Sequence, residues 1–84
     1  MVSPIIKLLA EESSVGTGGS AFNGNQLIRI YNIDNQDVTI TVKDASLNTT
    51  GSFTLHHATE AFVRKLPAES IFASATVKMV PVSF

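Results

Sequence analysis

The residues of this chain best suited to chemistry are two adjacent histidines, His56 and His57. An imidazole can bind a metal ion or transfer a proton near neutral pH. Adjacent side chains on a strand point to opposite faces, so the two rings could share a metal ion only in a turn. The sequence shows no other clustered ligands and no cysteine. We therefore expect both histidines to be solvent-exposed or packed, and we expect no metal site.

A glycine-rich run at residues 16–20 has the superficial look of a phosphate-binding loop. A Walker loop also needs lysine followed by serine or threonine at the start of a helix, and this run has neither. No serine stands in the Gly-x-Ser-x-Gly setting of a hydrolase nucleophile. The acidic residues form no recognisable acid–base pair, although folding could bring two of them together. The sequence thus favours a protein that is not an enzyme and has no cofactor.

The length of 84 residues predicts one domain, and one with little core of its own. Small domains usually gain stability from disulfides, a metal ion or association. The absence of cysteine removes the first route and thiolate metal sites. The apolar content of 44% is generous for so small a domain. Self-association or a larger partner is the remaining expectation.

The charge pattern bears on the kind of partner. Charged residues make up 15% of the chain, the net charge is −1, and the six basic residues are scattered. Nucleic-acid binding needs a clustered basic surface, so we expect no nucleic-acid partner. No apolar run reaches the ~18 residues of a membrane span, and the N-terminus lacks the basic start of a signal peptide. We expect synthesis in the cytoplasm and no membrane association.

The fold class follows from period-two alternation. Val38, Ile40 and Val42 alternate with polar residues, as on a strand with one buried face. Residues 34–37 form a polar turn, so we expect residues 27–33 and 38–43 to form a hairpin. Phe53 and Leu55 should point inward. Further strands are expected at 52–56, 60–66 and 71–84, the last being one strand or two with a break, and 67–70 is expected to open a short helical turn.

These elements predict an all-β fold, a small antiparallel β-sandwich or barrel (jelly-roll or Ig-like) of six to seven strands. Residues 1–84 form a single β domain. Residues 1–25 are interpreted as an N-terminal arm followed by a Gly/Ser-rich loop, and residues 26–84 as the β core. Within the arm, residues 4–10 form either a first strand or a segment that reaches a neighbour. The loop over residues 11–24 is either a mobile linker or a contact loop that becomes ordered on assembly.

The candidate contacts are apolar side chains of the arm, loop and C-terminus, together with the only cationic pair, Arg64 and Lys65. This pair either lies solvated on opposite faces of a strand or meets acidic residues of a partner. Aromatic residues near arginine are typical interface anchors, although each phenylalanine could instead belong to the core. The predicted partner contacts are Ile5, Ile6, Leu8, Phe22, Phe62, Arg64, Lys65 and Phe84.

The order of segments carries a resemblance. An apolar stretch and a Gly/Ser-rich loop are followed by Leu27-Ile28-Arg29-Ile30-Tyr31-Asn32, Val38-Thr39-Ile40-Thr41-Val42-Lys43-Asp44, Gly51-Ser52-Phe53-Thr54-Leu55, Phe62-Val63-Arg64-Lys65 and Pro67-Ala68-Glu69-Ser70-Ile71. This order resembles small β-rich virion proteins of tailed bacteriophages, notably those infecting marine bacteria and cyanobacteria. The similarity spans most of the chain and rests on strand patterns and turns.

The resemblance implies a structural role in the virion, after synthesis in the host cytoplasm. The first expectation is a capsid decoration (cement) protein that binds the outer shell and bridges capsid subunits. Its partner would be the major capsid protein or another virion protein, and the protein would form trimers, dimers or lattice-bound copies. The alternatives are a small neck, tail or fibre component and a carbohydrate-binding adhesin. The adhesin is disfavoured because the chain has no tryptophan and one tyrosine, Tyr31.

Overall fold

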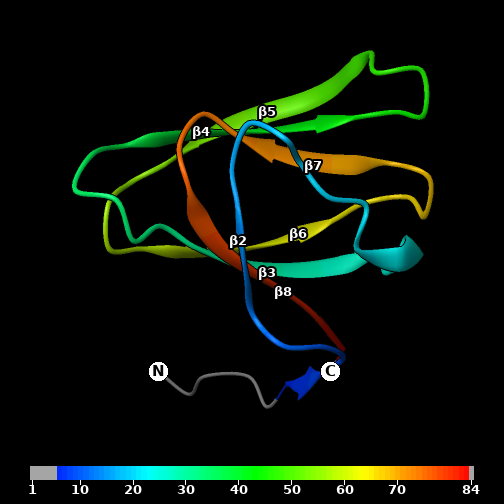
Figure 1. Ribbon diagram of the computed structural model, residues 1–84, viewed down its shortest axis with the longest axis horizontal. Coiled ribbons are helices and arrows are strands. Elements are labelled where there is room, and N and C mark those ends of the chain that lie inside the picture. Colours follow the sequence, from blue (N-terminus) through cyan, green and yellow to red (C-terminus); the bar gives the residue numbers. More distant parts are fainter. Residues whose placement is uncertain (1–5, 84) are drawn as a thin grey trace.

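Two antiparallel sheets pack face to face in the computed structural model, which describes residues 6–83 (Figure 1). The five-stranded sheet contains β1 (Lys7–Leu8), β2 (Ser13–Val15), β3 (Leu27–Tyr31), β6 (Glu60–Arg64) and β8 (Val77–Ser83). The three-stranded sheet contains β4 (Val38–Lys43), β5 (Thr49–Leu55) and β7 (Ser70–Ala73). A single 3-10 turn, η1 (Phe22–Gly24), precedes β3. The predicted all-β fold is confirmed.

The strand order shows a sandwich. The larger sheet has the order β1-β8-β3-β6, with β2 also paired to β8, and the smaller one has the order β5-β4-β7. No ladder joins the two sheets among the described strands, so the sheets do not close into a barrel. The described part of the chain contains eight strands instead of six or seven, because β1 and β2 are short additions to the edge of β8.

The core lies between the sheets and follows the predicted alternation. Val38 and Ile40 of β4 are 1% and 0% exposed, and Val42 packs against the same cluster. Ile28 and Ile30 of β3 face them from the other sheet and are fully buried. Burial of such side chains is the main favourable contribution to folding of a sandwich this small.

The expected hairpin between residues 27–33 and 38–43 is wrong. β3 pairs with β6 and β8, whereas β4 pairs with β5 and β7. The turn over residues 34–37 therefore carries the chain from one sheet to the other (Figure 1). A polar turn between two alternating strands indicates a change of direction, and it does not specify whether the strands pair or cross the core.

Asn32 explains why the chain crosses there. Its side chain is fully buried, and its Nδ2 donates to the backbone carbonyls of Gln36 and Leu55, both at 2.9 Å. Its Oδ1 accepts from the backbone N–H of Asp34 at 2.8 Å. The backbone of Asn32 also bonds the β5–β6 turn, through Thr59 O and Ala58 N. One amide thus ties the end of β3 to the end of β5 in the opposite sheet.

The described N-terminal region is part of the sandwich, so of the two interpretations of residues 4–10 the first strand fits residues 7–8, and the arm does not. β1 pairs with β8 through Lys7↔Ser83, and β2 pairs with β8 through Ser13↔Met79. Ser20 then forms a bridge with Ile71 of β7. Within the described residues, this segment therefore spans both sheets before β3 begins.

Pro81 fixes a bulge in that edge. Leu8 pairs with Val82 and Ser13 with Met79, so residues 9–12 face only two residues of β8. The N–H of Leu9 donates to Pro81 O at 3.0 Å. The nitrogen of Pro81 points to the same side as its carbonyl and has no hydrogen to donate. The ladder is interrupted where that donor is missing, which is where a sheet tolerates proline.

Three smaller expectations can also be compared with the structure. The C-terminal stretch forms two strands, β7 and β8, separated by a break. Residues 67–70 form a turn, closed by a bond from Glu69 N to Leu66 O, and no helical turn. Leu55 is buried as expected, but Phe53 on the same face stays 37% exposed because β5 is an edge strand.

The buried amide generates a stability prediction. Asn32→Ala should lower the free energy of unfolding by about 2–4 kcal/mol, because it removes three hydrogen bonds, one of them fully buried. Asn35→Ala, at an exposed position of the same turn, should change it by less than about 0.5 kcal/mol. Urea denaturation of both variants measures the difference, and equal losses would refute the proposed role of Asn32.

Candidate interaction surface

The two histidines lie in the exposed turn after β5. His56 Nδ1 is 3.1 Å from Asp37 Oδ1, and both side chains are more than half exposed. His57 is exposed as well. Residues 6–83 contain no group of three or more histidine, aspartate or glutamate residues that could hold a metal ion. Within the described residues, the structure therefore places His56 beside one carboxylate, that of Asp37, and this pair is too small a set to hold a metal ion.

The glycine-rich run covers the open side of β7. Gly16 O accepts from Ala73 N at 3.1 Å, and Ser20 exchanges two backbone bonds with Ile71. Gly19 has a φ of +69°, and a Cβ there would lie 2.5 Å from the ring of Phe72. A side chain at this position would collide with the ring, so the glycine allows the chain to lie close over β7. The glycine-rich run of residues 16–20 therefore serves to cover the edge of β7.

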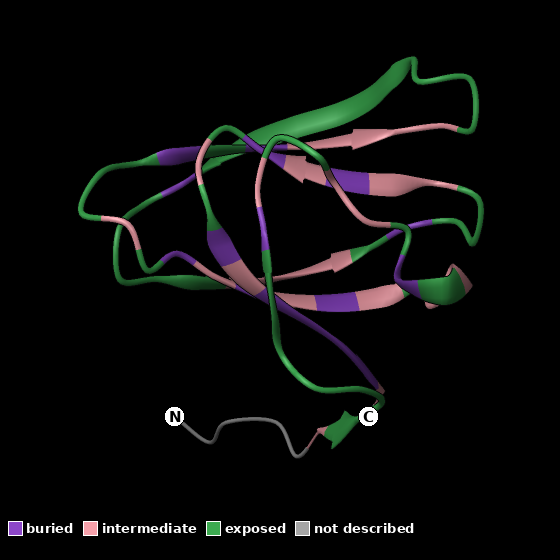
Figure 2. Ribbon diagram, in the orientation of Figure 1, coloured by how far each residue is buried: buried purple, intermediate pink, exposed green. Residues whose placement is uncertain are grey.

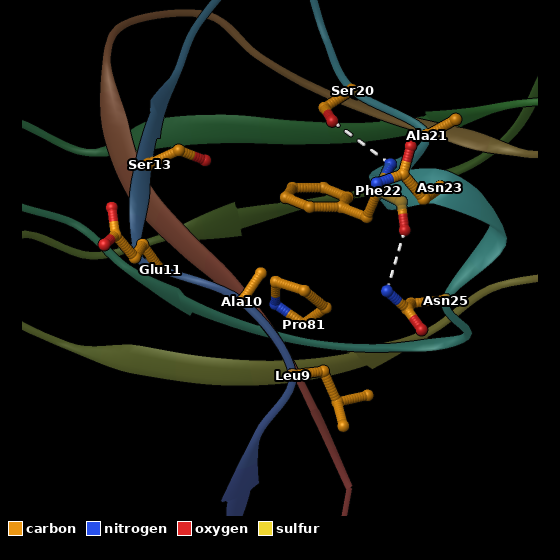
Figure 3. Close-up of a pocket in the computed structure, with 10 residues that line it drawn as sticks. All are labelled: Leu9, Ala10, Glu11, Ser13, Ser20, Ala21, Phe22, Asn23, Asn25 and Pro81. Carbon is orange, nitrogen blue, oxygen red and sulfur yellow. Dashed lines mark hydrogen bonds between the residues drawn. The ribbon is translucent and has the colours of Figure 1, made fainter.

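A cavity of about 400 Å³ opens where the bulge of residues 9–12 faces η1 (Figure 3). Figure 3 shows the ring of Phe22 turned toward Ala10 and Pro81. The lining residues are Leu9, Ala10, Glu11, Ser13, Ser20, Ala21, Phe22, Asn23, Asn25 and Pro81. The bulge that accommodates Pro81 therefore also shapes this cavity.

The polar groups around the cavity already hold the local turn. Ser20 Oγ accepts from Phe22 N at 3.1 Å, and Asn25 Nδ2 donates to Phe22 O at 2.9 Å. Phe22 and Asn23 have left-handed φ values of 54° and 53°, which is costly for an aromatic residue. Burial of the Phe22 ring in the core offsets that cost. Of the polar residues that line the cavity, Ser20 and Asn25 therefore stabilise a strained turn.

The predicted contact residues separate into three groups. Leu8 is 62% exposed and Arg64 is also exposed, while Ile6 and Phe62 are half-buried. Ile5 and Phe84 lie outside the described residues. Phe22 and Lys65 are 9% and 2% exposed. Buried side chains offer no surface to a partner, so these two are removed from the candidate contacts.

Lys65 differs most from what the sequence predicts. It was expected to be solvated or to contact a partner, and it is buried instead. Its Nζ donates to Leu66 O at 3.3 Å, while the aliphatic stem is enclosed by the protein. Burial lowers the pKa of Lys65 below its usual value of 10.5, and the nearby carboxylate of Glu69 partly opposes that shift. Its neighbour Arg64 alternates to the exposed side, which separates the two cations as the solvated interpretation expected.

The outer faces of the two sheets differ in chemistry. On the five-stranded sheet, Arg29 pairs with Glu60 at 2.6 Å and with Glu12 at 3.4 Å. Its guanidinium also lies 5.7 Å from the ring centre of Tyr31. The outer face of the three-stranded sheet is rich in hydroxyl groups instead, from Thr39, Thr41, Ser52 and Thr54.

Three of the four sheet edges in residues 6–83 are protected against further pairing. The β7 edge is covered by the glycine-rich run. The outer strands on β8 have only two and three residues and are separated by the bulge that contains Glu11 and Glu12. The β6 edge begins with Glu60 and ends with Arg64. Short strands, charges and covering loops are the usual means of preventing edge-to-edge association.

The fourth edge, β5, has none of these protections. It is seven residues long, has the sequence Thr-Thr-Gly-Ser-Phe-Thr-Leu, and contains neither charge nor proline. Residues 49–54 are all exposed, and Figure 2 shows this strand as a continuous exposed ribbon at the outer margin of the molecule. A long uncharged edge of this kind is a ready template for an added strand.

The hydrogen-bond pattern indicates which backbone groups of β5 face outward. Thr39 O accepts from Ser74 N at 3.0 Å, so the backbone groups of Thr39 face the β7 side. These groups alternate along a strand, so the following residue, which pairs with Phe53, faces β5. Phe53 thus bonds inward to β4. Its neighbours Ser52 and Thr54 direct their N–H and C=O groups toward the open edge.

Comparisons with protein-family models, curated proteins and solved structures found no match for this chain. Among residues 6–83, no helix has the length and apolar character needed to span a bilayer. The geometry of the chain itself is therefore the basis for the candidate site, and that geometry points to the β5 edge. Sequence reasoning placed a strand there and did not identify the edge, because strand order is not encoded in a local pattern.

The burial of Lys65 generates a pH prediction. Because its pKa is lower in the folded than in the unfolded protein, the unfolded state binds more protons in the pH range between these two pKa values. The free energy of unfolding contributed by Lys65 should therefore rise as pH increases from neutral toward 10.5. Lys65→Met should lack this rise and keep wild-type stability or exceed it at neutral pH, since it removes a desolvated charge.

Urea denaturation of the wild type and of Lys65→Met across this pH range measures the effect as the difference between two profiles. The comparison cancels the other titrating groups, which both proteins share. Parallel profiles would contradict the assignment of a lowered pKa to Lys65.

Proposed function

We propose that this protein is a non-enzymatic structural component of a tailed-phage virion. It decorates the outer capsid shell and bridges neighbouring capsid subunits. The proposal is supported by the order of segments from residue 27 to residue 71, which resembles small β-rich virion proteins. The observation that carries the binding role is the β5 edge, which is long, uncharged and exposed.

The β5 edge suits attachment to another β-rich protein. An added strand gains backbone hydrogen bonds whatever its sequence, and alternate side chains then supply specificity. Ser52 and Thr54 offer outward donors and acceptors, and Phe53 offers a partly exposed ring on the core face of the strand. The absence of charge along β5 removes the desolvation cost that charged groups would add at an interface centre.

A lattice role also fits the size of the domain. One strand edge provides a small contact area, and small interfaces bind weakly on their own. A shell presents many equivalent sites, so weak contacts made by many copies stabilise it together. The exposed Leu8 and Arg64 lie outside the β5 edge and are available for secondary contacts with a capsid subunit.

A neck, tail or fibre position is the alternative within the same structural role. The same strand edge would serve a ring or a fibre, and the number of copies distinguishes the positions. A shell protein occurs in numbers set by the capsid lattice, whereas neck and tail rings follow a low cyclic symmetry.

Quantitative peptide mass spectrometry of purified virions tests the proposal. We expect on the order of hundreds of copies per particle for a shell protein, and about a dozen or fewer for a neck or tail component. The abundance of the major capsid protein in the same sample provides the internal standard. Absence of the chain from particles that infect normally would refute a virion role.

A further inference from the structure

We propose that the β5 edge binds the β5 edge of a second copy of this chain, in an antiparallel two-fold pair centred on Ser52. The inference shares with the proposed function only the assumption that this edge is a binding surface. It names the occupant of the edge as the protein itself, and the dimer would then meet a capsid subunit through other exposed residues, such as Leu8 and Arg64. The two three-stranded sheets would then form one continuous sheet across the dimer.

The hydrogen-bonding pattern permits this pairing. A two-fold axis at Ser52 places Ser52 opposite its own copy, and the outward N–H and C=O groups of both residues then bond each other as a hydrogen-bonded pair. Thr54 would meet Thr50 of the second copy on each side of the axis, at the register shift where β5 begins. The regular register of β5 with β4 extends from Leu55 to Gly51, so the centre of the pair lies in undistorted strand.

The side chains are complementary in the same register. Phe53 lies opposite Gly51 of the second copy, in a non-hydrogen-bonded pair where side chains approach closest. Both residues point to the core face of the sheet. A Cβ at Gly51 would meet nothing within 4 Å, so the space above this glycine is open. The 37% exposed ring of Phe53 can cover that space, and a ring placed across a strand glycine compensates for its missing side chain.

The lack of charged residues on β5 permits pairing with a second copy. β5 has no ionisable residue, so an antiparallel copy places no like charges opposite each other. The β6 edge is different, because Glu60 and Arg64 stand at its two ends. β5 is also the edge left unprotected while the other three are covered, shortened or charged within residues 6–83.

Single cysteines test the register directly, because the natural chain has none. In Ser52→Cys, the paired Cα atoms should lie about 5.5 Å apart, which is within disulfide range. In the matched control Thr54→Cys, the two cysteines are four residues out of register, about 14 Å along the strand, which is too far to bridge. Both positions are exposed and on the same strand.

Under mild oxidation of the full-length protein, we expect Ser52→Cys to become a disulfide-linked dimer and Thr54→Cys to form no disulfide between copies. Equal cross-linking of both variants would indicate random collision and overturn the proposal. Cross-linking of neither, or of Thr54→Cys alone, would exclude a two-fold pair centred on Ser52.

Charge exchange provides a second test that does not depend on oxidation. Ser52→Lys and Ser52→Asp each place two like charges directly opposite each other at the two-fold axis. Each variant alone should be monomeric by light scattering at concentrations where the wild type has doubled its mass, while circular dichroism remains wild-type. An equimolar mixture should recover the dimer. A monomeric wild type, or a mixture that stays monomeric, would refute self-pairing.

The two proposals fail separately. If self-pairing fails, the copy number in the virion still tests the structural role. The strand that binds β5 would then belong to another protein. Absence from virions would refute the virion role, and a cross-linked Ser52→Cys dimer would still establish the interface.

Discussion

The backbone donors and acceptors at the edges of the two sheets constrain this structure more than any side-chain feature. A sandwich of eight strands has four edges, and every edge exposes N–H and C=O groups that another strand can bind. Residues 7–20 cover one edge and form only short strands on another, and charged residues stand at both ends of β6. β5 is left open. This difference is the basis of the binding role proposed for β5.

The N-terminal segment shows how a single residue can organise an edge. Pro81 cannot donate to the strand beside it, so the ladder between β8 and the N-terminal segment is interrupted there. The interruption divides the cover into β1 and β2 and produces the bulge of residues 9–12. The same bulge faces the strained turn at Phe22 and shapes the cavity between them. The cavity is therefore a product of edge protection, and two of its polar side chains, Ser20 and Asn25, hold the turn.

Sequence reasoning succeeded where the information is local. The alternation of Val38, Ile40 and Val42 determines which face of β4 is buried, whatever strand lies beside it. It failed where the question is which strands lie side by side in a sheet. The turn at residues 34–37 has the composition of a hairpin, and it is the amide of Asn32, bonded to Leu55 in the opposite sheet, that makes it a crossing. Likewise, a lysine beside an arginine is typical of an exposed surface. Lys65 is buried instead, because side chains alternate along the strand and its own points inward just after the end of β6.

The exposed ring of Phe53 connects the fold to assembly. In an isolated molecule, a core-facing phenylalanine on an edge strand has neighbours on one side only, so its burial remains incomplete. Adding a strand to β5 supplies the missing side and satisfies the outward backbone groups of Ser52 and Thr54 in the same step. Both gains favour association and neither requires a change in the monomer. A sandwich with so little core can thus bind a partner through the incompletely buried ring of Phe53 and the unpaired backbone groups of β5.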